Sequence, residues 1–344
     1  MAIATITFKP KQVTKKITSD LAPRAYDVIS NRFGLTDDAE QKTLEAIGDK
    51  YGITRERVRQ IENAALNTIR KSDAFQAEQD SLSSLKEVIS SLGSFVAEED
   101  LLNHLSKDKC VQNHIHFHLV LGDDFKNHKE DDDFKNRWSV DDQISDQVHS
   151  ALKNLYTSLN DEDIIPESEL ISKFVDNLKG VSDKYKNDEV AKRWLSISKG
   201  IDKNPLGEWG KADSPNVKTR GIKDYAFLVM RRHGSPMHFR EVAKAIYDTF
   251  GKKTHVATCH NELIKDSRFV LVGRGLYALK EWGYTQGVVK DVIREILKKE
   301  GSMNKDDIID RVMKERYLKK NTILVNLQNS KYFKKNKNGL YSAV

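Results

Sequence analysis

An internal repeat in the last third of the chain constrains its fold more than any other feature. Six residues recur in the same order, each of them 64 positions later. Each copy predicts three helices, the third capped by a threonine, followed by a β-hairpin with glycine in its turn. This is the plan of a winged helix, and the matched spacing disfavours two unrelated small helical domains. The pairs are Thr258 and Thr322, Leu263 and Leu327, Phe269 and Phe333, Gly275 and Gly339, Leu276 and Leu340, and Tyr277 and Tyr341.

The repeat predicts one winged helix at residues 219–283 and another at residues 286–344. Residues 85–140 follow the same plan more weakly, and we expect an acidic winged helix there. Residues 145–215, also acidic, predict three helices without a clear wing, which leaves open a winged helix or another helical domain. Residues 203–218, which overlap the end of this segment, hold two prolines and two glycines and predict an ordered loop.

The net charge of +6 is unevenly distributed along the chain. Residues 1–72 carry 13 basic and 9 acidic residues, residues 73–215 carry 17 and 29, and residues 216–344 carry 27 and 13. Basic ends indicate a polyanionic partner such as nucleic acid. The acidic middle is better suited to contacting protein or to holding the ends apart. Residues 1–17 hold four lysines, no acidic residue and no helical apolar pattern, which predicts a mobile basic arm.

A helix-turn-helix between residues 43 and 70 is the sharpest motif. Thr54 is placed to cap its second helix after a turn at Gly52. One face of that helix is apolar, and its N-terminal end, which enters the major groove in this motif, is polar. Arginine pairs with guanine, glutamine with adenine, and glutamate with cytosine. The predicted base-reading residues are Arg55, Glu56, Arg59 and Gln60.

Residues 18–72 resemble region four of bacterial sigma factors of the sigma-70 family. The resemblance is carried by Pro23-Arg24, Arg32-Phe33-Gly34-Leu35, Thr43-Leu44-Glu45 with Ile47-Gly48, and the run from Ile53 to Glu62. It implies a module that reads the −35 promoter element and docks on the flap of the RNA polymerase β subunit. It also implies that Thr43, Leu44 and Glu45, at a helix N-terminus, lie against DNA phosphate. A retained fold that binds only protein is the alternative. Since no promoter-melting region is recognisable, we expect that the chain does not open promoters alone.

Residues 219–283 are similar to the HARE-HTH winged helix, on the runs RGIKDYAFLVMRRHGSPMHFREVAKAI and THVATCHNELIKDSRFVLVGRGLYALKEWGY. That domain occurs in the δ subunit of some bacterial RNA polymerases, in chromatin-associated proteins and in some restriction systems. The δ-type acidic tail is absent, so displacement of nucleic acid by acidity is not expected. Basic residues in both repeat copies are predicted phosphate contacts, with a solvated basic face as the alternative. They are Lys265, Arg268, Arg274, Lys319, Lys320, Lys331, Lys334, Lys335 and Lys337.

Other signals argue against further classes of protein. The two cysteines exclude a disulfide framework, and no apolar run or N-terminal leader predicts a membrane span or secretion, so we expect a cytoplasmic protein. Zinc ligation by Cys110, His114, His116 and His118 is disfavoured because the spacing is unlike that of structural zinc sites. A charged run at residues 123–134 favours a solvated loop over a cation site. No phosphate-binding loop or nucleophile motif is present, and we expect no metal, cofactor or catalysis.

The sequence therefore predicts a mainly α protein, a helix-turn-helix followed by an array of small winged helices. We expect a bacterial-type, sequence-specific, non-catalytic DNA-binding protein that acts in transcription regulation. One alternative is an RNA polymerase accessory factor that docks on the β flap and competes with sigma. Another is the DNA-recognition component of a restriction or modification system. Double-stranded DNA is the expected partner, and the oligomeric state stays open.

Overall fold

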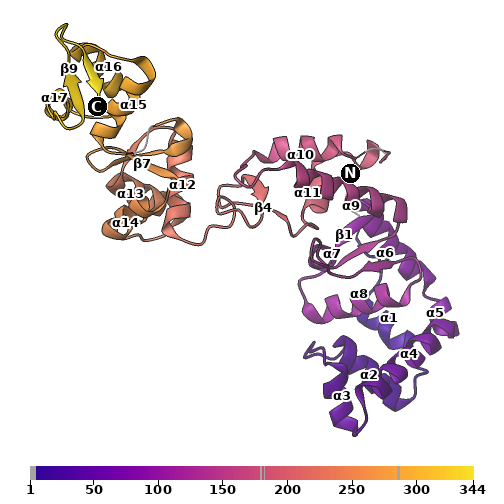
Figure 1. Ribbon diagram of the computed structural model, residues 1–344. Coiled ribbons are helices and arrows are strands. Elements are labelled where there is room, and N and C mark those ends of the chain that lie inside the picture. Colours follow the sequence, from indigo (N-terminus) through magenta and orange to yellow (C-terminus); the bar gives the residue numbers. More distant parts are fainter. Residues whose placement is uncertain (1–4, 179, 182, 285–286) are drawn as a thin grey trace. The chain divides into compact units, whose positions relative to one another are not determined.

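The computed structural model describes residues 5–344 apart from residues 179, 182, 285 and 286. The chain divides into two compact units, both mainly helical (Figure 1). The first unit holds residues up to Asp202 together with Trp209–Ala212, and the second holds Lys203–Glu208 and Asp213–Val344. Across these described ranges, none of the helices has the length and apolar character needed to cross a membrane.

The helix-turn-helix lies near the start of the first unit. Its helices are α2 (Pro23–Phe33), α3 (Leu44–Tyr51) and α4 (Arg55–Lys71). Proline starts α2 because the first helical position needs no N–H donor. The three helices enclose a small core of their own, whose buried members are Val28, Ile47 and Val58.

Residues 10–17 form a helix, α1 (Pro10–Ile17), so the expectation of a mobile arm is wrong for this segment. Val13 and Ile17 lie one helical turn apart and are buried in the core of the first unit. The three lysines of α1 are exposed on its other side: Lys11, Lys15 and Lys16. The buried face of α1 also includes Pro10 and Thr14, and a proline and a threonine at these positions conceal the helical apolar pattern in the sequence.

A winged helix follows the short helix α5 (Asp73–Gln76). Its elements are α6 (Gln79–Ser91), β1 (Phe95–Ala97), α7 (Glu98–Leu105), α8 (Lys109–Leu121), β2 (Lys126–His128) and β3 (Arg137–Ser139). The strands form an antiparallel sheet in the order β1-β3-β2, in which Trp138 pairs with both Val96 and Asn127. β2 and β3 are the wing.

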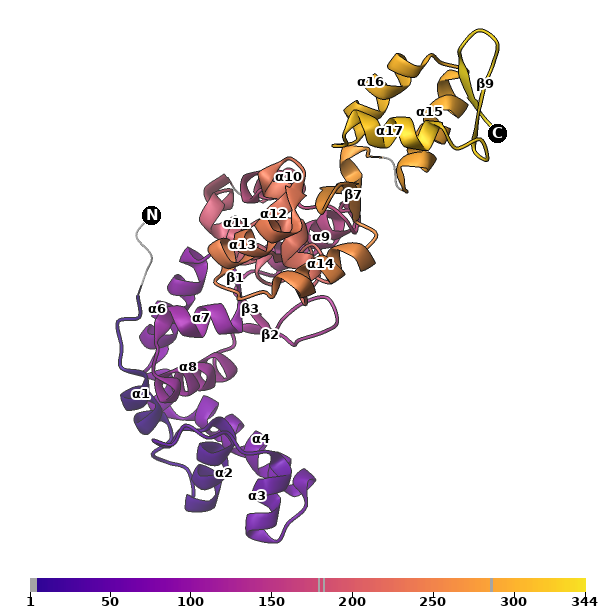
Figure 2. The same ribbon diagram turned by 90° about the vertical axis from the view of Figure 1, so that its left-hand side faces the viewer.

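This winged helix and the helix-turn-helix share one hydrophobic core, although the sequence predicted two separate modules. The core joins α1, α2 and α4 to α6, α7 and α8, through side chains that include Phe33, Ile69 and Phe117. Figure 2 shows α1 beside α8. The position of the helix-turn-helix is therefore fixed by the winged helix.

A second winged helix follows along the chain, and most of it lies in the first unit. It comprises α9 (Asp142–Ser158), α10 (Glu167–Asp176), the short helix η1 (Asp183–Tyr185), α11 (Asp188–Leu195), β4 (Ile201–Lys203) and β5 (Trp209–Lys211). β4 and β5 pair as the wing that the sequence did not reveal, so the expected loop at 203–218 is wrong for these strands. Gly207 supplies the turn with a φ of +81°, and Ile165 extends the sheet by a bridge to Trp209.

The second unit holds the two repeat copies. The first copy consists of α12 (Ile222–His233), β6 (Met237–His238), α13 (Phe239–Phe250), α14 (Val256–Lys265), β7 (Phe269–Gly273) and β8 (Leu276–Leu279). Its sheet has the order β6-β8-β7. After the 3-10 turn η2 (Lys280–Trp282), the chain leads into the second copy.

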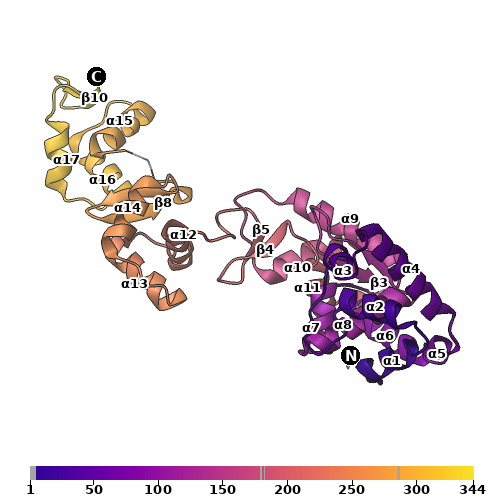
Figure 3. The same cartoon turned by 90° about the horizontal axis from the view of Figure 1, so that it is seen from below.

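The second copy consists of α15 (Val289–Glu300), α16 (Lys305–Glu315), α17 (Lys320–Leu327), β9 (Phe333–Lys335) and β10 (Tyr341–Ala343) (Figure 3). A bridge between Met303 and Tyr341 stands where the first copy has β6. The predicted threonine caps are wrong, because α14 and α17 begin before Thr258 and Thr322.

Candidate nucleic-acid interface

The turn between α3 and α4 is specified by two glycines. Gly52 has a left-handed backbone with a φ of +63°, which glycine adopts without strain. A Cβ atom added at Gly48 would lie 2.6 Å from the carbonyl oxygen of Ile53, so only glycine permits this approach. Thr54 caps α4 by accepting a hydrogen bond from Arg57 N at 3.2 Å. The local sequence therefore sets the direction in which α4 leaves the turn.

The N-terminal end of α4 presents the predicted base-reading side chains to solvent. All four are exposed: Arg55, Glu56, Arg59 and Gln60. Val58, on the opposite side of the same turn, is fully buried in the small core. The structure thus brings the four side chains together on two consecutive turns of one helix.

In the unbound protein these side chains bond to one another. Arg59 donates two hydrogen bonds to Glu56, at 2.9 and 2.7 Å, and these bonds hold the pKa of Glu56 below its usual value. Arg57 donates to Gln60 Oε1 at 2.9 Å. Contact with base edges would exchange these bonds for others of the same kind. Arg57 was missed by the sequence analysis, although its position three residues before Gln60 indicates a shared face.

The N-terminus of α3 is capped by Thr43. Thr43 Oγ1 accepts a hydrogen bond from Ala46 N at 3.1 Å, and the first N–H groups of the helix have no intrahelical acceptor. Leu44 packs its side chain on the small core, so only its backbone can face a phosphate. Glu45 is exposed and suits the positive helix end, but its carboxylate would repel a phosphate.

A polar cluster ties α3 to α2. Lys50 Nζ donates to Asp27 Oδ2 at 2.7 Å, the Tyr51 hydroxyl donates to the same oxygen, and Arg24 lies 5.0 Å from the Tyr51 ring centroid. Burial raises the pKa of Asp27, but the bonds from Lys50 and Tyr51 outweigh it and leave that pKa below its usual value. An ionised Asp27 therefore holds the two helices together.

The C-terminal half of α4 is anchored on α8. Arg70 donates to the carbonyl oxygens of Val120 at 2.7 Å and Leu121 at 3.1 Å, which close that helix. Asn113, also on α8, donates to Gly34 O at 2.9 Å and to Ala39 O at 3.0 Å. The bonds of Arg70 fix the C-terminal end of α4, and none of these bonds involves the N-terminal end of that helix.

The third helix of the first winged helix, α8, is consequently covered by protein. Thr14 Oγ1 of α1 lies 2.9 Å from His114 Nδ1 and 3.0 Å from His118 Nε2. Burial, followed by the charge of Lys11, lowers the pKa of His114 to about 4, and burial, followed by His114, lowers that of His118 to about 3. The two rings are neutral and join α1 to α8.

The remaining members of the cysteine and histidine group have separate partners. Cys110 Sγ lies 3.4 Å from Thr36 O, and His116 Nδ1 lies 3.2 Å from Glu98 Oε2. On a helix, residues four apart share a face, so His116 points away from the pair that contacts Thr14. The structure does not bring these side chains together as one set.

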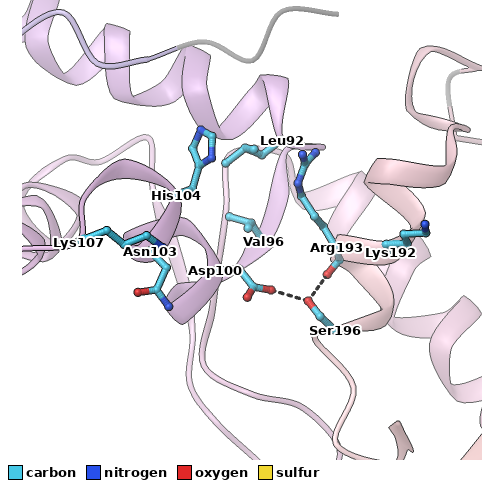
Figure 4. Close-up of a pocket in the computed structure, with 9 residues that line it drawn as sticks. All are labelled: Leu92, Val96, Asp100, Asn103, His104, Lys107, Lys192, Arg193 and Ser196. Atoms are coloured by element: carbon cyan, nitrogen blue, oxygen red, sulfur yellow. Dashed lines mark hydrogen bonds between the residues drawn. The ribbon is translucent and has the colours of Figure 1, made fainter. Parts of the chain in front are cut away.

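The third helix of the second winged helix, α11, is held against the first. Trp194 Nε1 donates to Phe95 O at 3.0 Å, and α11 opens with two exposed carboxylates, Asp188 and Glu189. A pocket lies beside this contact, between α7 and α11 (Figure 4). In it the Ser196 hydroxyl lies 2.5 Å from Asp100 Oδ2 and 2.7 Å from Arg193 O, so its polar groups join the two domains.

In the first repeat copy, two of the three predicted phosphate contacts are exposed. Lys265 ends α14, and Arg274 lies in the turn between β7 and β8. Arg268 is different, and its prediction as a phosphate contact is wrong. It donates to Asp224 at 2.8 Å, to Asp266 at 3.0 and 2.8 Å and to Asn216 at 3.1 Å, which commits four hydrogen bonds to protein acceptors.

In the second repeat copy, all the predicted basic residues are exposed. Lys319 and Lys320 stand at the start of α17, Lys334 and Lys335 lie on β9, and the remaining two are Lys331 and Lys337. Two cations on α15 were not predicted from the sequence, Lys290 and Arg294, which lie within 5.4 Å of the Tyr332 ring centroid. Their spacing of four residues on one helix face was the available signal.

Comparison with known proteins confirms both resemblances. Residues 19–71 match the family described as Sigma-70, region 4. Residues 220–282 match HARE-HTH, a helix-turn-helix domain whose description names ASXL and restriction endonuclease among its members. The first match covers the helix-turn-helix, and the second covers the first repeat copy.

Sigma factors are among the curated relatives. The chain is 50% identical over 56 residues to RNA polymerase sigma factor SigA of Nostoc, which is 16% of this chain and 14% of that protein. It is 47% identical over 60 residues to SigA of Clostridium acetobutylicum, with 17% and 16% covered. With RpoD of Helicobacter pylori, 45% of 60 residues are identical, with 17% and 9% covered. The chain is therefore similar to sigma-70 region 4 across α2 to α4 and to HARE-HTH across α12 to β8.

Proposed function

We propose that this chain is a non-catalytic, sequence-specific DNA-binding protein that acts in transcription regulation. The observation that carries the proposal is the N-terminal end of α4. There Arg55, Glu56, Arg59 and Gln60 are exposed together while the rest of the helix is anchored on α8. A helix fixed at one end and polar at the other suits insertion into the major groove.

The chemistry of these side chains supports base recognition. Arginine can form two hydrogen bonds with guanine, glutamine two with adenine, and glutamate can accept from cytosine. The family match over residues 19–71 supports the same end of α4 as the DNA-contacting end, and Thr43 at the cap of α3 as a phosphate contact. The two matched families together point to DNA binding in transcription.

The division of the chain supports distinct roles for its helix-turn-helix and its winged helices. The third helices α8 and α11 are engaged with protein, whereas α14 and α17 present exposed residues such as Lys265 and Lys320. We propose that the second unit adds phosphate contacts without reading sequence. Two linked modules that bind one DNA gain affinity from their effective concentration, even where each binds weakly.

Contact with RNA polymerase is a second candidate, favoured by the identity to proteins named RNA polymerase sigma factors. Docking on the β flap would need an apolar surface on the helix-turn-helix. In the described part of that module, Tyr26 is the exposed large hydrophobic side chain, at 48%. The apolar sides of α2 and α4 already pack on α8. This arrangement supports DNA over a protein partner for the module.

Selection from a random pool of DNA duplexes at ~150 mM salt tests the proposal, because non-specific phosphate binding is weak there. We expect the full chain to enrich a short motif and the double variant Arg59→Ala, Gln60→Ala to lose it. The matched control, Asn67→Ala with Lys71→Ala, removes the same charge from exposed positions near the other end of α4. A motif that both double variants retain would refute base reading by α4.

A further inference from the structure

The two repeat copies differ in the balance of charge at one equivalent position, which is Arg268 in the first copy and Tyr332 in the second. In the first copy Arg268 lies 5.1 Å from the Phe227 ring centroid and is neutralised by Asp224 and Asp266. Lys223 lies 3.7 Å from Asp266 as well. Two cations and two carboxylates thus form a closed, compensated network between α12 and the start of β7.

In the second copy the ring and the cation have changed places. Tyr332 stands 64 residues after Arg268, and Arg294 stands 67 residues after Phe227. Arg294 lies 5.4 Å from the Tyr332 ring centroid, so the same kind of contact forms with the partners exchanged. Lys290, the counterpart of Lys223, lies 4.5 Å from that centroid and donates to the Tyr332 hydroxyl at 3.4 Å.

One of the two compensating carboxylates, that of Asp266, is missing from the second copy. Ser330 stands in the place of Asp266, and Lys331 in the place of Ser267. Lys331 is the third cation on the ring, at 5.9 Å from the centroid. Asp291, the counterpart of Asp224, caps α15 by accepting from Val288 N at 3.1 Å. The substitutions therefore remove acid and add base around one aromatic ring.

The result is a cluster of uncompensated positive charge, which we name the Tyr332 cluster: Lys290, Arg294, Lys331 and Tyr332. Within the described residues, no ion pair joins any of its cations to a carboxylate. Arg294 Nε is buried without a hydrogen-bond partner there. The bond from Lys290, together with the charges of Lys290, Lys331 and Arg294, holds the pKa of Tyr332 below its usual value.

Three cations within 6 Å of one point repel one another unless an anion lies among them. We propose that the Tyr332 cluster binds a phosphate group of the nucleic-acid backbone. The two cationic side chains of α15 and Lys331 supply the positive charge, and the Tyr332 hydroxyl, which accepts from Lys290, can donate its own proton to a phosphate oxygen.

The cluster gives the last winged helix a second line of contact. Its side chains come from α15 and from the segment between α17 and β9, whereas the predicted contacts Lys319 and Lys320 stand at the start of α17. The inference rests on the proposed function, because it names a phosphate contact within a DNA-binding protein.

Salt dependence of DNA binding tests the cluster directly. For a fluorescent duplex of random sequence, Lys290→Gln with Arg294→Gln should flatten the slope of log K against log salt by about 0.9, the contribution of one phosphate contact. The control, Lys298→Gln with Lys299→Gln, removes two exposed charges from the other end of α15. Equal changes in the two variants would overturn the proposal.

A second variant tests charge compensation without removing a cation. Ser330→Asp restores the carboxylate of the first copy and should weaken DNA binding while leaving the melting temperature unchanged or higher. Ser302→Asp adds the same charge after the far end of α15 and should have a smaller effect on binding. If Ser330→Asp leaves the affinity at the control level, the cluster does not contact DNA.

The outcomes separate the cluster from the proposed function. If the full chain selects a motif and the cluster variants match their controls, the function stands and the inference fails. If the chain binds no DNA, the proposed function fails. Addition of inorganic phosphate then tests whether the cluster binds an anion, because a bound anion raises the pKa of Tyr332. Ultraviolet titration of the wild type and of Tyr332→Phe measures that pKa. A rise in the pKa of Tyr332 would indicate that the cluster binds a small anion instead of the DNA backbone. An unchanged pKa would exclude both a small-anion site and a backbone contact.

Discussion

Acid should destabilise the first unit through the two histidines of α8, and this prediction tests whether that helix is buried. The unfolded chain protonates histidine near pH 6.5, whereas His114 and His118 have pKa values of about 4 and about 3 in the folded protein. The unfolded state therefore binds more protons between these limits. Stability is fully present above pH 6.5 and falls as the pH drops toward 4.

The size of the effect follows from the pKa difference. At pH 5, 1.5 units below the unfolded value, each neutral histidine costs about 2 kcal/mol at 1.36 kcal/mol per unit. The two histidines together therefore lower the free energy of unfolding by about 4 kcal/mol between neutral pH and pH 5. Other groups of the first unit titrate here too, including His149 with a pKa of about 4, so the variant must isolate the pair.

Urea unfolding at pH 7.5, 6 and 5 measures this loss. Three of the four tryptophans lie in the first unit, so their fluorescence follows its transition. The variant His114→Gln, His118→Gln should be less stable than the wild type at pH 7.5 but lose about 4 kcal/mol less on acidification. His104→Gln, at an exposed position, should keep the wild-type pH dependence. If the double variant also keeps it, α8 is not packed on α1 as described.

Three further predictions follow from single contacts. Gly48→Ala should destabilise the helix-turn-helix by about 1–3 kcal/mol and weaken motif selection, because its Cβ would meet the Ile53 carbonyl; unchanged melting would contradict this. Arg268→Ala should lower stability by about 3–5 kcal/mol because it leaves the buried carboxylate of Asp224 without its cation, yet keep the salt slope of DNA binding. Lys334→Ala with Lys335→Ala should leave the melting temperature unchanged but weaken binding to all DNA sequences and flatten the salt slope.

The features predicted well from sequence are local. The helix-turn-helix depends on residues within one short stretch, from the cap at Thr54 to the buried Val58, and the repeat depends on equal spacing along the chain. Helix order, the turn and the exposed end of α4 follow from such patterns without knowledge of distant contacts.

The features that were missed depend on residues far apart in sequence. Arg268 has one partner, Asp266, only two positions away, but its partners Asp224 and Asn216 lie 44 and 52 positions away, and these distant contacts could not be predicted from the sequence. The burial of α8 needs Thr14, 100 positions from His114, and nothing near α8 indicates it. The wing of β4 and β5 was hidden because each strand has three residues, too few to show an alternating pattern.

A change of DNA specificity is the sharpest test of base reading by the N-terminal end of α4. Gln60→Glu keeps the length of an exposed side chain and replaces a donor for adenine with an acceptor for cytosine. The motif selected by this variant from a random duplex pool should differ from the wild-type motif at one position, with adenine replaced by cytosine. An identical motif, or none from either protein, would contradict the account.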